Sequence, residues 1–388
     1  MKRLVFALAF SLVFGLAVMA FAEGEEGTAV KTDWTSNIQV GGYIDVRPSF
    51  YWFTPENGDL KETHQSDIVF YQAGLTVTAV PFSAVRGVAT AYYGEGPVNW
   101  ANTDLGNNAA GSLYFDEGYL QLGDGNGLYA RFGKYYIPTV SKDTFGMHFN
   151  LLQRNLYANP VALGAGYNHK YFGVSAHLFN GRHDTVSSSG NPDNDIIDTY
   201  SAALNVNPLA MFERYNLTIG GFYLTDATET WGQFDALFNG PAINYDENVP
   251  LYGGYLVGRF YFSDLVGLGV RGEYATTGKF DKEDYLDAKG DDTAISFMNA
   301  EVALLFWESV LQLGGKYESV NGLDYFGVTS PTSPYYDPKY EAVSYHRYGG
   351  FLRTNLMEEL SLGLEYLAGA DDEGNADKEL QIQARLDF

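Results

Sequence analysis

The chain has 388 residues, no cysteine and a formal net charge of −24. The missing cysteines exclude a fold held together by disulfides, and the acidic balance excludes nucleic acid as a partner, because phosphate contacts need a basic surface. The 44 glycines, 30 tyrosines and 26 phenylalanines, against only 13 prolines, indicate a protein built from many β-strands.

The amino-terminal segment has the pattern of a secretory signal peptide. Lys2 and Arg3 precede an apolar run from Leu4 to Phe21, which ends in an A-x-A cleavage site at 20–22. The run is also about long enough to anchor the chain in a membrane. The acidic residues that follow at once favour cleavage, so we expect a signal peptide over 1–22 and a short periplasmic leader over 23–33.

Alternation of apolar and polar residues predicts about sixteen strands in the rest of the chain. Most have about the ten residues that a tilted membrane strand needs. The longest remaining apolar run, Val302–Trp307, is far too short for a spanning helix. The predicted strands are Ile38–Val46, Val69–Ala79, Val85–Tyr93, Leu113–Leu122, Leu128–Ile137, Val161–Asn168, Tyr171–Asn180, Ile197–Val206, Tyr215–Thr225, Leu251–Phe262, Val266–Thr276, Ala294–Phe306, Val310–Val320, Ser344–Leu356, Leu360–Leu367 and Leu380–Phe388.

The connections between these strands alternate in length. The short ones are 81–82, 123–127, 169–170, 207–214, 263–264, 307–309 and 358–359; the long ones are 53–66, 94–111, 138–160, 181–196, 226–250, 278–293, 321–343 and 369–378. An up-and-down barrel in a membrane sorts its connections in this way, because turns lie on one side and loops on the other. The pattern predicts an all-β transmembrane antiparallel barrel with short periplasmic turns and long extracellular loops. No linker divides 34–388, which we expect to be one domain.

The carboxyl-terminal strand carries a further signal. Its apolar residues are Leu380, Ile382, Ala384, Leu386 and Phe388, with polar residues between them. This ending resembles the last strand of bacterial outer-membrane β-barrels, whose final aromatic residue belongs to the signal read by the assembly machinery. The resemblance implies that Phe388 is an assembly signal, and that the partners are this machinery, outer-membrane lipid and lipopolysaccharide. The five apolar side chains are then expected to face lipid.

Charged residues on the polar faces are the candidate pore-lining residues. A basic side chain on the lipid face near the midplane would cost about 2–4 kcal/mol, so these groups are expected to face the lumen, which sixteen strands leave open to water. For each arginine, the alternative is a salt bridge or hydrogen bond that stabilises the inner wall. The candidates are Arg47, Arg86, Glu117, Arg131, Lys134, Arg259, Arg271, Glu273, Glu301, Lys316, Arg347, Arg353 and Arg385.

The long connection 138–160 differs from the others because it is mostly uncharged and rich in Phe and Leu. A loop this apolar is not expected to lie free in water. It is the third long loop, and in general porins, which it resembles in position, the third long loop folds into the barrel and narrows it. The resemblance implies Lys142, Asp143, His148 and Arg154 as constriction residues. The alternative is a loop that caps the barrel or packs against a neighbouring subunit.

One hairpin is similar to a more specific family. Residues 116–122 read DEGYLQL and residues 130–138 read ARFGKYYIP. They resemble the "DEAY-x-x-L … GKQYVPFG" hairpin of LbtU-type siderophore porins, and depart from it where residues 136–139 read YIPT in place of the usual YVPF. The resemblance covers only this hairpin, and it implies passage of ferric siderophores as an alternative function.

Catalysis is not expected. The chain has no H-E-x-x-H pattern and no G-x-S-x-G elbow, and we expect neither a cofactor nor a metal. A barrel enzyme or an adhesin remains a minor alternative. The sequence thus predicts an outer-membrane porin for passive diffusion of small hydrophilic solutes and ions, with a homotrimer expected only by analogy. Acidic loops favour cations and wall arginines favour anions, so the sequence leaves ion selectivity open.

Overall fold

The computed structural model describes sixteen strands and one short helix. The described residues are 38–54, 63–82, 84–94, 112–123, 125–139, 144–146, 151–156, 158–179, 199–227, 249–280, 293–322, 344–372 and 374–388. The predicted signal peptide and leader lie outside them. The elements are β1 (Ile38–Thr54), β2 (Thr63–Phe82), β3 (Val85–Gly94), β4 (Ser112–Leu122), β5 (Leu128–Lys134), α2 (Leu151–Leu156), β6 (Val161–His169), β7 (Phe172–Phe179), β8 (Thr199–Val206), β9 (Tyr215–Leu224), β10 (Leu251–Tyr261), β11 (Val266–Phe280), β12 (Thr293–Phe306), β13 (Leu311–Asn321), β14 (Ser344–Asn355), β15 (Leu360–Asp371) and β16 (Ala376–Asp387).

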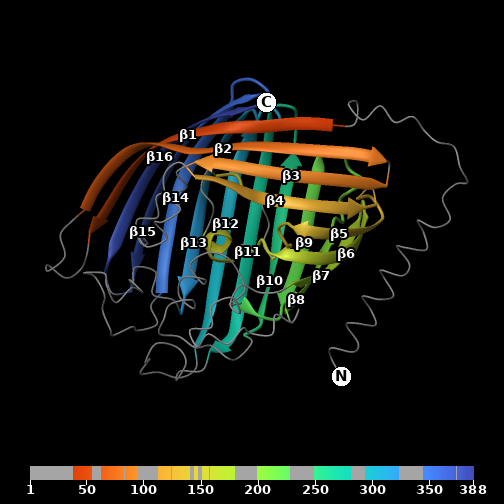
Figure 1. Ribbon diagram of the computed structural model, residues 1–388. Helices are drawn as coiled ribbons and strands as arrows, with labels where there is room; N and C mark the ends of the chain where they lie inside the picture. The colour runs from red at the N-terminus through yellow and green to blue at the C-terminus, as the bar shows by residue number, and fades with distance from the viewer. Residues whose placement is uncertain are drawn as a thin grey trace, which may run out of the picture.

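The strands form one closed antiparallel barrel in which each strand pairs with its neighbours in sequence (Figure 1). β16 closes the ring against β1, in register from Tyr43 opposite Asp387 to Thr54 opposite Ala376. The backbone of Phe388 extends this pairing through two hydrogen bonds with Gly42, of 2.8 and 2.9 Å. Closure leaves no strand edge to meet lipid, so the predicted all-β barrel of sixteen strands is confirmed.

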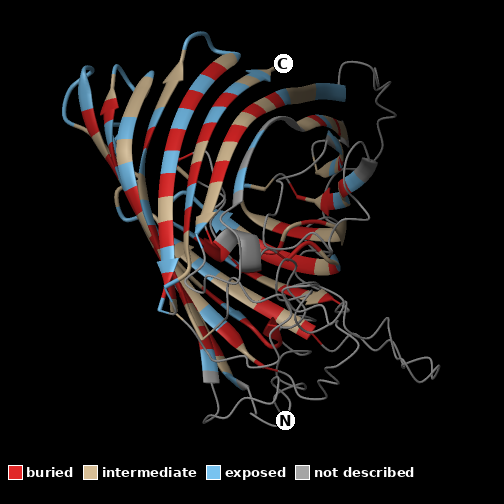
Figure 2. Ribbon diagram, turned by 90° about the vertical axis from the view of Figure 1, so that its left-hand side faces the viewer, coloured by how far each residue is buried: buried red, intermediate tan, exposed pale blue. Residues whose placement is uncertain are grey.

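The two faces of the wall differ as the alternation predicts (Figure 2). In β16, Ile382 and Leu386 are 42 % and 44 % exposed on the outer face, whereas Gln381 and Gln383, on either side of Ile382, are 7 % and 5 % exposed on the inner face. An apolar exterior around polar inner positions is the reverse of a water-soluble fold, and it suits a lipid surround. Among the described helices, none is long and apolar enough to cross a membrane.

Two of the predicted connections are wrong in length. The long loop expected at 369–378 is a tight turn, because β15 continues to Asp371 and β16 begins at Ala376. Asp371 holds this turn by accepting hydrogen bonds from the backbone N–H of Asn375 at 2.8 Å and from its side-chain amide at 2.9 Å, and Gly374 supplies a φ of 91°. The connection expected at 53–66 shortens to 55–62, because β1 and β2 continue past the predicted ends.

Candidate functional site

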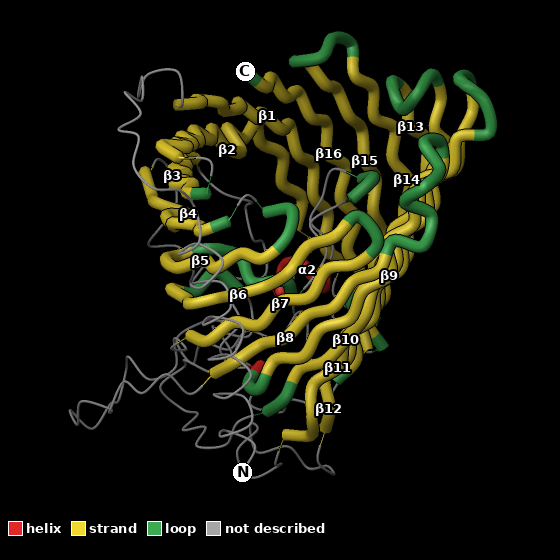
Figure 3. The backbone as a smooth tube through the Cα atoms, turned by 90° about the vertical axis from the view of Figure 1, so that its right-hand side faces the viewer, coloured by secondary structure: helices red, strands yellow, loops and turns green. Residues whose placement is uncertain are grey.

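Part of the long connection between β5 and β6 lies inside the barrel (Figure 3). The Thr144 hydroxyl donates to Glu301 Oε1 at 3.1 Å, and the Phe145 N–H donates to Glu301 Oε2 at 2.8 Å. The Gly146 N–H adds a longer contact of 3.5 Å to the same oxygen. Because Glu301 belongs to β12, on the opposite side of the ring from β5, these bonds place segment 144–146 across the lumen. The alternative of a loop that only caps the barrel is therefore wrong for this part of it.

The short helix α2, from the same connection, packs on the inner wall against β11, β12 and β13. Its Leu151, Leu152 and Leu156 are at most 1 % exposed. Burying each leucine contributes about 1.5–3 kcal/mol, which holds the loop against the wall. The wall side chains that share this cluster are apolar at positions that face inward: Phe222, Leu224, Leu251, Ala275, Ile295, Phe297, Val320 and Tyr345. The inner face is thus not uniformly polar, because one sector of it is built to receive the loop.

Phe145 anchors the tip of the inserted segment. Its ring is 2 % exposed and packs with Ala303, Leu305 and Phe351. The Arg259 guanidinium carbon lies 5.4 Å from the ring centroid, a cation–π distance. The ring rests on the backbone of Gly269, where an added Cβ would come within 2.5 Å of Phe145 Cζ. Sequence reasoning missed Gly269, although a glycine inside a strand is a known sign that another group approaches closely.

We expect the substitution Gly269→Val to displace Phe145 and raise the single-channel conductance, because the new side chain occupies the space of the ring. The matched control is Gly272→Val on the same strand, where an added Cβ meets only Leu256 of the outer face at 3.8 Å. Conductance steps of the two variants in planar bilayers provide the comparison. Equal steps in both variants and the parent would contradict this role of Gly269.

The neck of the loop is held by the hairpin that resembles the siderophore porins. Asp116 of β4 accepts a 2.5 Å hydrogen bond from the Tyr136 hydroxyl and a 3.1 Å bond from the Asn159 amide. Just beyond, the Thr139 hydroxyl donates to the carbonyl oxygen of Leu156 at 2.9 Å. These contacts tie both ends of the loop to the wall. The shared hairpin residues therefore have a structural role in positioning the loop.

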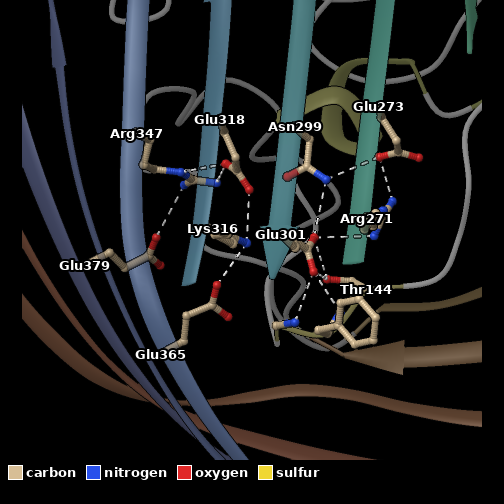
Figure 4. A network of polar contacts seen from close by, with 12 residues as sticks. Thr144, Arg271, Glu273, Asn299, Glu301, Lys316, Glu318, Arg347, Glu365 and Glu379 are labelled. Carbon is tan, nitrogen blue, oxygen red and sulfur yellow. Dashed lines mark hydrogen bonds and ion pairs between the residues drawn. The ribbon is translucent and has the colours of Figure 1, made fainter. Parts of the chain in front are cut away.

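A network of buried ions lies on the wall from β11 to β16 (Figure 4). Arg271 pairs with Glu273 at 2.6 Å and with Glu301 at 3.4 Å. Lys316 pairs with two carboxylates, Glu318 at 3.0 Å and Glu365 at 2.9 Å, and Arg347 pairs with Glu318 at 2.5 Å. An added Cβ at Gly146 would lie 3.0 Å from Glu365 Oε1, so the loop passes directly over this carboxylate.

Burial separates these ions from open water. Five predicted pore-lining residues belong to the network and are at most 4 % exposed: Arg271, Glu273, Glu301, Lys316 and Arg347. The expectation that each of them borders the water-filled lumen is therefore wrong, although they lie on the inner wall. The alternative, salt bridges that stabilise the wall, describes them better. Arg47 is a similar case, because it is buried in a 2.8 Å pair with Asp45.

Other candidates on the inner wall are partly open to water. Arg385 pairs with Asp387 at 2.7 Å, and its guanidinium carbon lies 3.9 Å from the ring centroid of Tyr43. Arg131 donates to Gln121 Oε1 at 2.8 Å. Side chains with partial or full exposure are those of Arg86, Glu117, Arg131, Arg259, Arg353 and Arg385.

Lys134 does not face the lumen. It is in register with Val161, which is 70 % exposed on the outer face, while Arg131 lies on the inner face of the same strand. Its ammonium group donates to the carbonyl oxygen of Phe115 at 3.0 Å. Lys134 is the last residue of β5, where a long side chain can extend from the apolar band toward water. The sequence assignment failed because Arg131 and Lys134 are three positions apart, and a period of two places such residues on opposite faces of a strand.

The four predicted constriction residues cannot be placed by their side chains. Lys142, Asp143 and His148 lie outside the described residues, as does the side chain of Arg154. Within the described part of the chain, no group of three or more His, Cys, Asp or Glu residues could hold a metal ion.

Comparison of the barrel with solved structures identifies its fold. The chain is similar to OprB of Pseudomonas putida, with a TM-score of 0.58, 11 % identity, and coverage of 93 % of this chain and 96 % of that one. The chain has the porin fold. It also matches an anion-selective porin from Comamonas acidovorans, with a TM-score of 0.56, 11 % identity, and coverage of 90 % and 99 % of the two chains.

A third porin-fold structure is OmpT, an outer membrane protein of Vibrio cholerae, in a trimer form. Its TM-score is 0.51, with 13 % identity and coverage of 90 % of this chain and 99 % of that one. No family model and no curated protein matches the chain.

Proposed function

We propose that the chain is an outer-membrane porin that passes small hydrophilic solutes and ions by diffusion. The observation that carries this proposal is a closed sixteen-stranded barrel with an apolar outer face, in which one loop crosses the lumen to Glu301. A barrel of this size leaves an aqueous channel, and the inserted loop narrows it.

The proposal includes the bacterial outer membrane as the location, and a homotrimer as the assembly, by likeness to the OmpT trimer form. Phe388 remains our proposed assembly signal. Passage of ferric siderophores receives no separate support, because Asp116 and Tyr136 of the resembling hairpin are engaged in holding the loop neck. We propose no enzymatic activity.

Planar-bilayer recording of the purified protein tests the pore. We expect stepwise conductance increases, each from one channel or one assembly of channels. Folding is checked beforehand by the heat-dependent gel mobility of closed barrels. A folded sample that gives no conductance steps would contradict the proposal. Liposome uptake of sugars of increasing size, compared with a ferric siderophore of similar size, then separates general diffusion from the siderophore alternative.

A further inference from the structure

The inner wall does not present its two signs of charge equally to water. The carboxylates Glu273, Glu301, Glu318 and Glu365 are at most 4 % exposed, and each has an ion-pair partner within 3.4 Å. These four carboxylates exceed in number the three cations of the network, Arg271, Lys316 and Arg347. The inserted loop partly compensates for the extra negative charge, because its hydroxyl and N–H groups donate hydrogen bonds to Glu301. The loop therefore lies over acidic groups that would otherwise border the lumen.

Four arginines on the same inner wall have no carboxylate within ion-pair distance among the described residues. Arg131 donates only to the neutral Gln121, and Arg259 contacts the ring of Phe145. Arg86 is exposed and forms no hydrogen bond or ion pair within the described ranges, and Arg353 has a buried Nε atom without a partner. The one comparable carboxylate is Glu117 of β4, which is partly exposed and has no partner in the described part of the chain.

The four arginines lie near the ends of strands that meet the short turns. Arg86 is the second residue of β3 and Arg131 the fourth of β5, both just after a turn. Arg259 and Arg353 are each third from the end of β10 and β14, just before a turn. Because these strands are spread around the ring, arginines without a direct ion pair border the lumen from several sides at its turn end.

Two of these arginines form a compact pair. Arg86 is in register with Gln121, and Gln121 is in register with Arg131, so the two cations flank one amide on three adjacent strands. Their backbones are about 10 Å apart, twice the spacing of neighbouring strands. The Tyr119 and Tyr135 rings lie 4.6 and 5.1 Å from the Arg131 guanidinium carbon and hold it in place.

We propose that this channel is selective for small anions, and that Arg86 and Arg131 form its principal anion-binding station. The inference deepens the proposed pore function and rests on it. An unpaired guanidinium attracts chloride, phosphate or a carboxylate, and low-dielectric walls focus its field along the lumen. The acidic long connections join the opposite ends of the strands, which an apolar band about 25 Å tall separates from the turn end, more than the Debye length of about 10 Å at 0.1 M salt. The net charge of −24 thus does not set the selectivity.

The reversal potential of the channel in a KCl gradient tests the proposal. We expect it to lie toward the chloride equilibrium potential, with a chloride-to-potassium permeability ratio of about three or more. A reversal toward the potassium potential, with normal conductance steps, would overturn the anion selectivity and leave the pore intact. A folded protein without conductance steps would overturn the pore itself and this inference with it.

Variants then test the assignment to the arginine pair. The double variant Arg86→Gln with Arg131→Gln is expected to lower the permeability ratio at least about twofold. Inorganic phosphate added to the parent channel should bind at the arginine pair and reduce the chloride current, and this reduction should be smaller in the double variant. Arg131→Lys, which keeps the charge, should retain the selectivity. The matched control is Arg214→Gln, which removes the same charge from an exposed turn pair with Asp264 outside the lumen. An unchanged ratio in the double variant, or an equal drop in the control, would overturn the assignment.

Discussion

Replacement of Glu301 by alanine is expected to release segment 144–146 of the inserted loop and produce a wider, noisier channel. The carboxylate accepts hydrogen bonds from the Thr144 hydroxyl and the Phe145 N–H, and it pairs with Arg271. Hydrogen bonds to charged groups contribute about 1.5–3 kcal/mol each, so most of the polar anchoring of segment 144–146 is lost. Arg271 keeps Glu273 as its partner at 2.6 Å, so the wall itself is expected to persist.

Two measurements separate loop release from general damage. Liposome swelling with sugars of increasing size is expected to show a larger size limit in Glu301→Ala, and a smaller increase in Glu301→Gln, whose amide oxygen still accepts. The cysteine-free chain also permits a thiol probe at Leu152, which is 1 % exposed. Leu152→Cys should resist a water-soluble thiol reagent in both the parent and the Glu301→Ala background, because the leucine packing of α2 does not involve Glu301. An unchanged size limit in a Glu301→Ala protein that keeps this thiol protection would show that Glu301 does not hold segment 144–146.

The strands could be predicted from the sequence because their pattern has one physical cause. A wall with lipid outside and polar groups inside imposes a period of two, as the exposed Ile382 and buried Gln383 of β16 show. The turn after Asp371 escaped detection because its acidic residues look like a solvated loop, whereas the Asp371 side chain closes the turn by bonding Asn375.

The site was less predictable than the fold. Apolar residues such as Phe222 and Phe297 occupy inward-facing positions because they belong to the cluster in which α2 is buried. The expectation that inward-facing residues of a membrane barrel are polar does not predict apolar positions that receive an inserted loop. Alternation indicates which charged residues lie on the inner face, whereas Lys134, among the predicted residues, lies on the outer one. A charged wall residue is neutralised when a residue of another strand pairs with it, as Glu365 of β15 pairs with Lys316 of β13. Its exposure to water also depends on which part of the wall the inserted loop covers. Neither follows from the alternation of a single strand.

Replacement of Lys316 by methionine is expected to cause a large loss of stability. Its ammonium group is fully buried between Glu318 at 3.0 Å and Glu365 at 2.9 Å, and both of these carboxylates are also fully buried. Removing one member of a buried ion pair costs about 3–5 kcal/mol, because the remaining buried charge loses its compensating counter-ion. Glu318 keeps Arg347 as a cation partner, so the loss of the Lys316 ammonium group affects Glu365 most.

Urea unfolding in lipid vesicles measures the loss, and a second substitution identifies its cause. Lys316→Met with Glu365→Gln should recover part of the free energy of unfolding, since the buried charge is removed together with its partner. Arg214→Gln is the control: its pair with Asp264 has side chains 56 % and 72 % exposed, and such pairs contribute at most about 1 kcal/mol. If Lys316→Met proved as stable as Arg214→Gln, or if the double variant were no more stable than Lys316→Met, the unpaired carboxylate could not be the source of the effect. Recovery in the double variant would locate the cost in electrostatics and not in packing, since both variants carry the same methionine.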